Sequence, residues 1–231
     1  MSGCTLQFSR NSPLRTTLVD EATGHPKYQI DTPRKIARSV TRIRRFDSPT
    51  QPPLHQDDDV DSDSGDDITD KGKKKSESKE DKHNREEADE ADGGAELLET
   101  SDGIARIYWK WFSPDRIVFQ GKITTRSEFL PKCGKMSGSY MFTGPDGIEY
   151  RWAMGAMGMN YPKLVTTDEK KTVIAEFHRA HYFMKRRKAR LEVQPAGMHM
   201  LDYIVLTFVF AEDKRRERER RANSSGGGGG P

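Results

Sequence analysis

An apolar stretch near the C-terminus, residues 198–211, constrains the fold more than any other feature of the sequence. It is apolar on every side, whether it forms a strand or a helix, so the rest of the chain must enclose it. The stretch is 14 residues long and contains His199 and Asp202, whereas a membrane-spanning helix needs roughly twenty apolar residues. We therefore expect a buried segment and not a transmembrane one.

The secondary structure of this stretch is ambiguous from its residues. Its β-branched and aromatic side chains favour a strand. The charged run that follows contains no Gly or Pro, and it places Glu212 four residues before Arg216 and Glu217 four residues before Arg221. This spacing stabilises a helix. Propensity and spacing thus leave both structures open.

Two groups of short alternating segments predict β-strands. The first group lies at residues 5–8, 16–19, 28–30 and 36–43. The second lies at residues 104–111, 117–119, 140–143, 148–152, 163–166, 172–178 and 190–193, with Val173, Ala175 and Phe177 expected to face inward. Pro145 and Gly147 predict a hairpin turn, and residues 126–130 a short helical turn. About eleven or twelve strands indicate a barrel or a sandwich.

An acidic segment separates the two groups. Residues 47–99 contain 19 Asp and Glu against 7 Lys and Arg, with few aromatic or β-branched residues. Such a segment cannot offset its ordering entropy, and a long loop costs entropy only logarithmically. We therefore predict one split β domain (residues 1–46 and 102–213), a disordered acidic insert (47–101) and a charged helical extension with a Gly-rich tail (214–231).

Charge and cysteine content indicate the compartment. The net charge is +3, so the chain outside the acidic insert is distinctly basic. Cys4 and Cys133 are too few for a disulfide framework, and the first thirty residues lack a signal-peptide pattern. We expect an intracellular protein, cytoplasmic or nuclear, with reduced thiols.

Potential nucleophiles and metal ligands are few, namely Cys4, Cys133, His178, His181 and His199. They show no spacing typical of a metal or catalytic site, and the two histidines at 178 and 181 would point to different faces. We predict no catalytic residues, no metal and no cofactor. His199 and Asp202 are expected to make structural polar contacts at the start of the last element.

Four large aromatic residues occupy alternating positions in predicted strands. We expect core packing, rather than stacking on a ligand, for Trp109, Trp111, Phe142 and Trp152.

A basic cluster follows three large side chains, Tyr182, Phe183 and Met184, and predicts a ligand surface; its members are Lys185, Arg186, Arg187, Lys188 and Arg190. Cations beside aromatic residues are attracted to anionic membranes. The same run would also suit nucleic-acid phosphates or an import signal, and a solvated basic turn is the simplest alternative.

Several segments resemble an uncharacterised family of fungal proteins abundant in mushroom-forming species: residues 26–33, 104–109, 129–131, FTGPDGIEYRW at 142–152, 175–179 and 199–205. That family is distantly similar to the tubby C-terminal, LURP-one-related and phospholipid scramblase group. The resemblance implies a mainly β fold, an antiparallel barrel of about twelve strands around a hydrophobic C-terminal helix. It therefore favours a helix for the apolar stretch, and it implies no catalytic residues.

We expect a non-enzymatic binding or scaffolding module that contacts anionic phospholipid at the membrane surface. This expectation rests partly on fold analogy. The alternative is a protein-interaction or nuclear adaptor whose basic segments contact a protein partner or, less favoured, nucleic acid. A weaker alternative is an enzyme with an unrecognised pocket.

Overall fold

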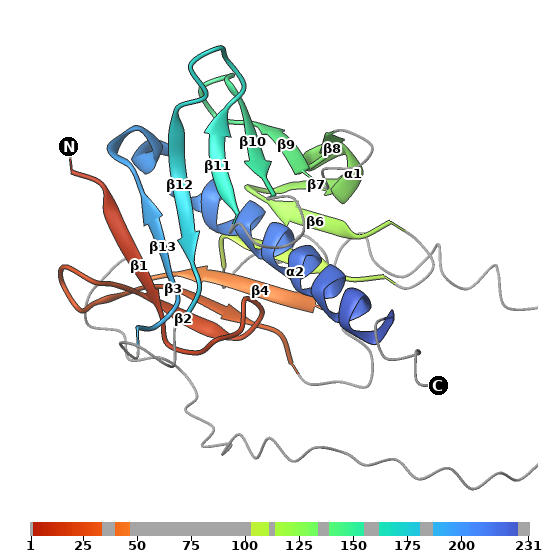
Figure 1. The fold of residues 1–231 in the computed structure, drawn as a ribbon, viewed down its shortest axis with the longest axis horizontal. Helices are drawn as coiled ribbons and strands as arrows, with labels where there is room; N and C mark the ends of the chain where they lie inside the picture. The colour runs from red at the N-terminus through yellow and green to blue at the C-terminus, as the bar shows by residue number, and fades with distance from the viewer. Residues whose placement is uncertain are drawn as a thin grey trace, which may run out of the picture.

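The computed structural model describes residues 2–33, 40–46, 103–110, 114–133, 139–154, 162–180 and 187–225. Thirteen strands and three helical segments form the fold (Figure 1). The strands are β1 (Cys4–Phe8), β2 (Thr16–Asp20), β3 (Pro26–Asp31), β4 (Val40–Arg45), β5 (Ala105–Tyr108), β6 (Arg116–Phe119), β7 (Lys122–Thr125), β8 (Lys132–Cys133), β9 (Ser139–Thr143), β10 (Glu149–Ala153), β11 (Lys163–Thr166), β12 (Val173–His178) and β13 (Arg190–Val193). The helices are α1 (Arg126–Phe129), the 3-10 helix η2 (Pro195–Met200) and α2 (Leu201–Ser225).

All thirteen strands belong to one antiparallel sheet, in the order β7-β6-β5-β4-β3-β2-β1-β13-β12-β11-β10-β9-β8. The mainly β fold is therefore confirmed. The sheet has two strands that the alternating pattern did not predict, β7 and β8. Strand β7 is too polar and β8 is too short to show that pattern. Within the described ranges the sheet is open between these two edge strands, and closure into a barrel stays a prediction.

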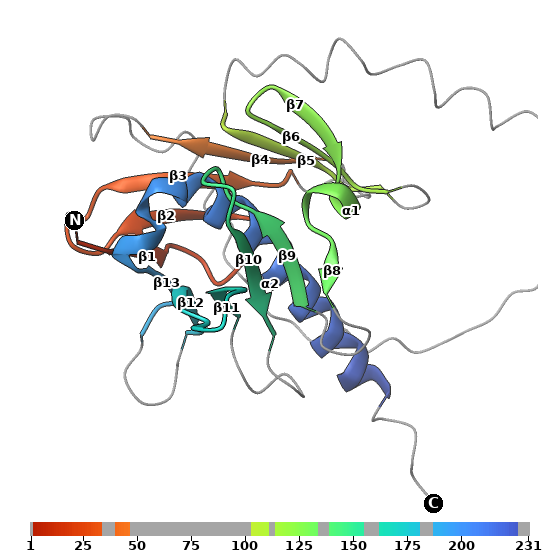
Figure 2. The same ribbon diagram turned by 90° about the horizontal axis from the view of Figure 1, so that it is seen from above.

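The apolar stretch forms the first half of α2, and the sheet curves around it (Figures 1 and 2). Residues 204–211 are fully buried. Phe208 lies at the centre, with its ring 4.9 Å from Phe177, 5.6 Å from Phe8 and 5.8 Å from Trp152. The predicted C-terminal helix is confirmed. A helix presents apolar side chains in all directions to the surrounding sheet, which a strand cannot do.

Strands β4 and β5 are neighbours although some sixty residues separate them in the chain. Thr41 is opposite Ile107, and Ile43 is opposite Ala105. All four side chains are buried and face α2. The residues on both sides of the acidic segment therefore share one sheet; residues 47–102 lie outside the described ranges.

One inward-facing residue was predicted wrongly in β12. Val173 is 37% exposed, whereas its neighbour Ile174 is 3% exposed. The register of β11 and β12 shifts here, so that Leu164 faces Ala175 but Val165 faces Val173. The extra residue is a β-bulge, which reverses the in-out alternation on one side of it. Ala175 and Phe177 face inward as predicted.

The local turn predictions are confirmed. Strands β9 and β10 form the hairpin, with Gly147 at φ +77° in its turn. Helix α1 begins with a capping box, in which Thr125 and Glu128 each accept a hydrogen bond from the other's backbone amide. Phe129 of α1 packs against Tyr203 of α2, which places α1 between the two edge strands of the sheet.

The aromatic residues predicted for the core are buried where the structure describes them. Trp152 is fully buried, and Phe142 and Trp109 are 3% and 9% exposed. Trp111, like the first residues of the strand predicted at 36–43, lies outside the described residues.

Candidate functional site

A pocket of about 260 Å³ opens where the end of β1 meets the start of β13. Its floor is apolar, because the buried side chains of Phe8 and Ala189 form it. The amide of Phe8 donates a hydrogen bond to the carbonyl oxygen of Ala189. We call it the β1–β13 pocket; it is lined by Phe8, Ser9, Arg10, Asn11, Ala180, Arg187, Lys188 and Ala189.

Two cations of the predicted basic cluster are on the rim of this pocket. Arg187 and Lys188 are exposed, and neither side chain forms a hydrogen bond or ion pair with any residue that the structure describes. Arg10 lines the opposite wall. The basic cluster thus contributes an unneutralised rim to an apolar depression. Lys185 and Arg186 of the same cluster lie outside the described residues.

Arg190, the last member of the basic cluster, does not line the pocket. It lies on the outer face of β13, where its Nε donates to Glu192 at 2.7 Å. His178 Nε2 lies 3.2 Å from the other oxygen of Glu192. Partial burial would raise the pKa of Glu192, but the hydrogen bond from Arg190 and the nearby charges outweigh it and lower that pKa. Arg190 is therefore an ion-pair partner within the sheet.

Side-chain hydrogen bonds hold the β1–β2 turn that forms one pocket wall. Ser9 Oγ accepts from the amide of Thr17 at 2.8 Å, and Thr16 Oγ1 accepts from the amide of Arg10 at 3.2 Å. These bonds satisfy backbone groups that the ladder leaves unpaired at the strand ends. The wall is thereby fixed before any ligand binds.

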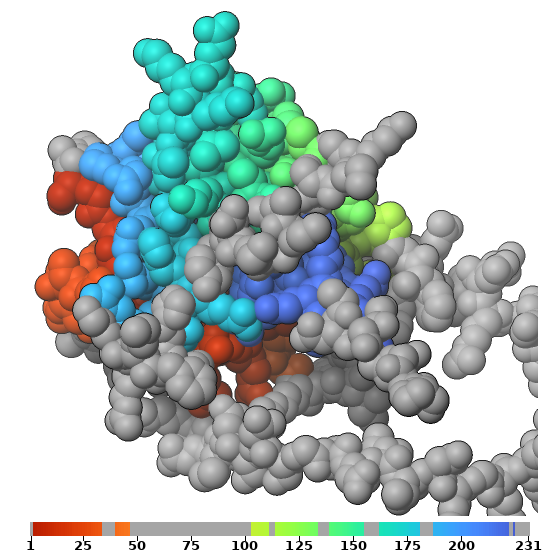
Figure 3. Space-filling view, in the orientation of Figure 1, coloured from red at the N-terminus to blue at the C-terminus, as the bar shows by residue number. Residues whose placement is uncertain are grey.

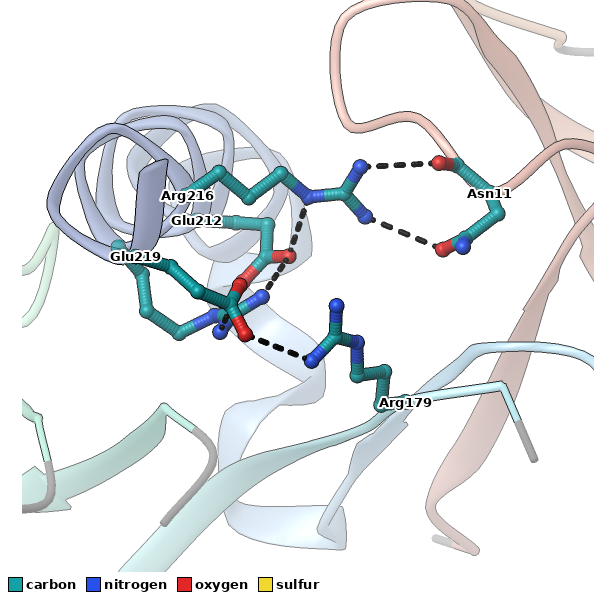
Figure 4. A network of polar contacts seen from close by, with 6 residues as sticks. Asn11, Arg179, Glu212, Arg216 and Glu219 are labelled. Atoms are coloured by element: carbon teal, nitrogen blue, oxygen red, sulfur yellow. Dashed lines mark hydrogen bonds and ion pairs between the residues drawn. The ribbon is translucent and has the colours of Figure 1, made fainter. Parts of the chain in front are cut away.

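The charged half of α2 fastens the same turn from the other side (Figure 4). Arg216 donates to the backbone oxygen of Asn11 at 2.9 Å and to Asn11 Oδ1 at 3.1 Å. Its Nε donates to Glu212 at 2.7 Å. Glu212 is fully buried, so Arg216 supplies one of the positive charges that a buried carboxylate requires.

The opposite pocket wall is fastened to the same helix. Arg179, which precedes Ala180, donates to Glu219 at 2.9 Å, and Glu219 accepts a second bond from Arg215 at 3.1 Å. Burial would raise the pKa of Glu219, but the bond from Arg179 and the two arginine charges lower it. We call these residues the α2 polar network: Asn11, Arg179, Glu212, Arg215, Arg216 and Glu219.

Arg215 is the buried member of the α2 polar network. It donates twice to Glu212, at 2.7 and 3.0 Å, and these bonds raise the pKa of its guanidinium despite the burial. Beyond this point α2 reaches the surface beside β12, as the space-filling view shows (Figure 3). The network therefore separates the enclosed apolar half of α2 from its exposed end.

The polar residues predicted at the start of the last element also have structural partners. His199 Nε2 lies 2.9 Å from Asp146 Oδ2, which accepts a 2.6 Å bond from Tyr150. Asp202 accepts a 2.5 Å bond from Tyr28 and forms an ion pair with Arg45 at 3.3 Å. The two do not pair with each other; His199 fastens the end of η2 and Asp202 the beginning of α2, each to a different part of the sheet.

The sequence analysis predicted Arg187 and Lys188 as ligand-surface residues, but it did not predict Arg10 or the other residues of the pocket walls. Asn11 lies in a turn signal, and the run from Glu212 to Arg221 carries only a helical charge pattern. The i,i+4 spacing correctly predicted the pairs Glu212 with Arg216 and Glu217 with Arg221. The contacts of this run with Asn11 and Arg179 depend on the position of α2 inside the sheet, which no local pattern encodes.

A family model described as "Family of unknown function (DUF6593)" matches residues 11–217. The match includes the strands from β2 onward and most of α2. No curated protein and no solved structure matches the chain. The resemblance to the tubby, LURP-one-related and scramblase group stays a prediction. Among the described residues, no helix is long and apolar enough to cross a membrane.

Proposed function

We propose that this chain, which belongs to the family of unknown function DUF6593, is a binding module that contacts anionic phospholipid through the β1–β13 pocket. The observation that carries this proposal is the pair Arg187 and Lys188, two exposed cations without partners among the described residues, beside the apolar floor formed by Phe8. An apolar depression with a cationic rim complements a lipid headgroup and the glycerol region next to it.

The size of the pocket supports a headgroup rather than a cofactor. Its volume of about 260 Å³ is below the roughly 300 to 1,000 Å³ of pockets that enclose whole small-molecule ligands. We therefore propose peripheral contact, in which one headgroup enters the pocket and the surrounding cations interact with the membrane surface.

We propose that the module has no catalytic activity of its own. The two histidine–carboxylate pairs on the described surface support this reading, because each fastens two elements together: His199 with Asp146, and His178 with Glu192. A tubby-like closed barrel is the architecture we propose for the family; the curved antiparallel sheet around α2 supports it.

Vesicle co-sedimentation of the full chain tests the lipid proposal. We expect binding to vesicles of phosphatidylcholine mixed with phosphatidylserine, weakened by added salt, and little binding to phosphatidylcholine alone. Removing both rim charges in Arg187→Gln/Lys188→Gln should weaken binding by about 2 kcal/mol, roughly 30-fold. The thermal stability should be unchanged, because these side chains have no described partner to lose.

The matched control is Lys132→Gln/Lys170→Gln, which removes the same charge from exposed positions that do not line the pocket. It should bind as the unmodified protein does. Equal binding to both vesicle types, or an equal loss in both variants, would contradict a specific role for the β1–β13 pocket. A protein or nucleic-acid partner would then be the better explanation of the basic cluster.

A further inference from the structure

Two arginines of neighbouring strands lie directly opposite each other on the outer face of the sheet. Arg42 of β4 is paired in register with Arg106 of β5. The next pair along the same two strands, Ile43 and Ala105, is buried against α2. Because successive side chains of a strand alternate between faces, both arginine side chains leave the sheet on the outer side.

Among the described residues, one carboxylate lies next to this pair in the ladder, and no ion pair neutralises either arginine. Side chains directly opposite in an antiparallel pair have Cβ atoms about 4.5 to 5.5 Å apart, and like charges at that distance repel. Neither Arg42 nor Arg106 forms a hydrogen bond or ion pair with a residue in the described part of the chain. The carboxylate opposite Arg42 on β3, Asp31, forms its ion pair with Arg15 at 3.9 Å.

The residues around the pair make the face more basic. Arg44 lies two positions from Arg42 on the same face, and Arg116 of β6 is opposite Tyr108 in the adjacent row. Arg42 and Arg116 are exposed, and Arg106 is half-buried. Among the described residues, Arg42, Arg106 and Arg116 have no partner for their guanidinium groups, and the phenol ring of Tyr108 lies beside them.

We infer that Arg42 and Arg106 together bind a phosphomonoester dianion. A guanidinium group donates two parallel hydrogen bonds to phosphate oxygens, and two adjacent groups can engage one phosphate from both sides. A phosphomonoester carries close to two negative charges at neutral pH, which matches the two arginines, whereas a carboxylate or phosphodiester carries one. The bound group would convert the repulsion across the strands into two attractive contacts.

This site is independent of the β1–β13 pocket, because it lies on β4 and β5 and none of its residues lines the pocket. We assign the phosphomonoester to a phosphorylated peptide, because Asp31 lies opposite Arg42 and disfavours contact with an extended anionic membrane surface. A phosphoinositide headgroup is the competing source, and calorimetric titration of the full chain distinguishes the two. One arm uses a phosphoserine peptide and its unphosphorylated counterpart; the other compares vesicles containing a phosphatidylinositol monophosphate with phosphatidylserine vesicles of equal charge.

We expect monoester-dependent binding in the peptide arm, whereas monoester-dependent binding in the vesicle arm alone would overturn the assignment to a peptide. Equal binding of phosphorylated and unphosphorylated peptide, together with equal binding of the two vesicle types, would overturn the inference. Absence of binding in both arms would overturn it as well. Failure of the pocket proposal would leave this result unchanged, since phosphatidylserine serves here as the reference.

Variants locate the site. Arg42→Gln/Arg106→Gln should weaken the monoester-dependent binding at least tenfold, whereas Lys132→Gln/Lys170→Gln, with the same loss of charge at exposed positions outside both sites, should change it less than twofold. Arg106→Glu adds a second readout: a glutamate opposite Arg42 can form a cross-strand ion pair, so this variant should melt at a higher temperature while losing the binding. Unchanged affinity in the double variant, or an equal loss in both doubles, would overturn the assignment.

Discussion

The guanidinium group of Arg216 on α2 donates two hydrogen bonds to Asn11 in the β1–β2 turn, at 2.9 Å to its backbone oxygen and 3.1 Å to Oδ1. The two residues are 205 positions apart in the chain. Because Asn11 also lines the β1–β13 pocket, the end of the chain determines the position of a wall built from its beginning.

Replacing Arg216 by Met keeps most of the aliphatic stem and removes both bonds to Asn11 together with the bond to the buried Glu212. We expect a loss of about 2 kcal/mol in the free energy of unfolding, since Glu212 keeps its two bonds from Arg215. Urea denaturation measures it. Arg220→Met, at an exposed position of the same helix, should change stability by less than about 0.5 kcal/mol. Equal effects would mean that the bonds of Arg216 to Asn11 and Glu212 do not stabilise the fold.

Glu212→Gln should destabilise the protein far more than a surface change. Glu212 is fully buried and neutralises Arg215, whose side chain is 7% exposed, so its loss leaves a buried guanidinium with Glu219 as its remaining partner. We expect a cost of about 3 kcal/mol. Glu217→Gln, which breaks the more exposed pairs with Lys214 and Arg221, should cost less than about 1 kcal/mol. Similar midpoints in urea would contradict this difference.

Phe208→Ala tests the enclosure of α2. The ring contacts Phe8, Phe177 and Trp152, and its removal should cost about 3 to 5 kcal/mol through lost burial and the cavity left behind. Ile123→Ala, at a side chain that is 42% exposed, should cost under about 1 kcal/mol. Val205→Asp should prevent folding, because an unpaired charge would be enclosed in apolar surroundings. A cooperative thermal transition of Val205→Asp would be incompatible with the buried helix.

Acid should weaken the contact between the β9–β10 turn and η2. Burial would raise the pKa of Asp146, but hydrogen bonds from Tyr150, the amide of Ile148 and His199 lower it below 3.8. A carboxylate with a lowered folded-state pKa contributes stability above its unfolded value, and this contribution is lost as the pH falls through the folded value.

Asp146→Asn should therefore melt at a lower temperature than the unmodified protein at pH 5 to 6, with the difference shrinking below about pH 4. Thermal melts across this range provide the measurement. Glu169→Gln, at an exposed carboxylate in the β11–β12 turn, serves as the control for a change of charge. A difference in melting temperature that stays constant down to pH 3 would show that the charge of Asp146 does not stabilise the fold.

Local sequence patterns determined most of the elements of this protein. Alternating apolar residues predicted the strands, and Pro145 with Gly147 predicted the hairpin, because a two-residue period and a positive φ are properties of a few adjacent residues. The charge spacing from Glu212 to Arg221 predicted helical pairs for the same reason. Arg187 and Lys188 were predicted to lie on a ligand surface; both line the β1–β13 pocket, and their binding of a ligand stays a proposal.

Local patterns did not determine how these elements meet. The apolar stretch would have been assigned to a strand by propensity, and it is a helix because the sheet supplies apolar contacts on all its sides. The bulge at Ile174 reversed a predicted face, since bulges arise from the pairing of two strands and not from one.

Only the tertiary structure decided which distant residues face each other. Arg216 contacts Asn11 because the curved sheet holds α2 at one fixed position along its axis, and Arg42 faces Arg106 because β4 and β5 pair in one register. A register shift of one residue would move every side chain of a strand to the other face. The sequence thus determined which residues form strands and helix, and the packing of the sheet around α2 decided which of their charges meet.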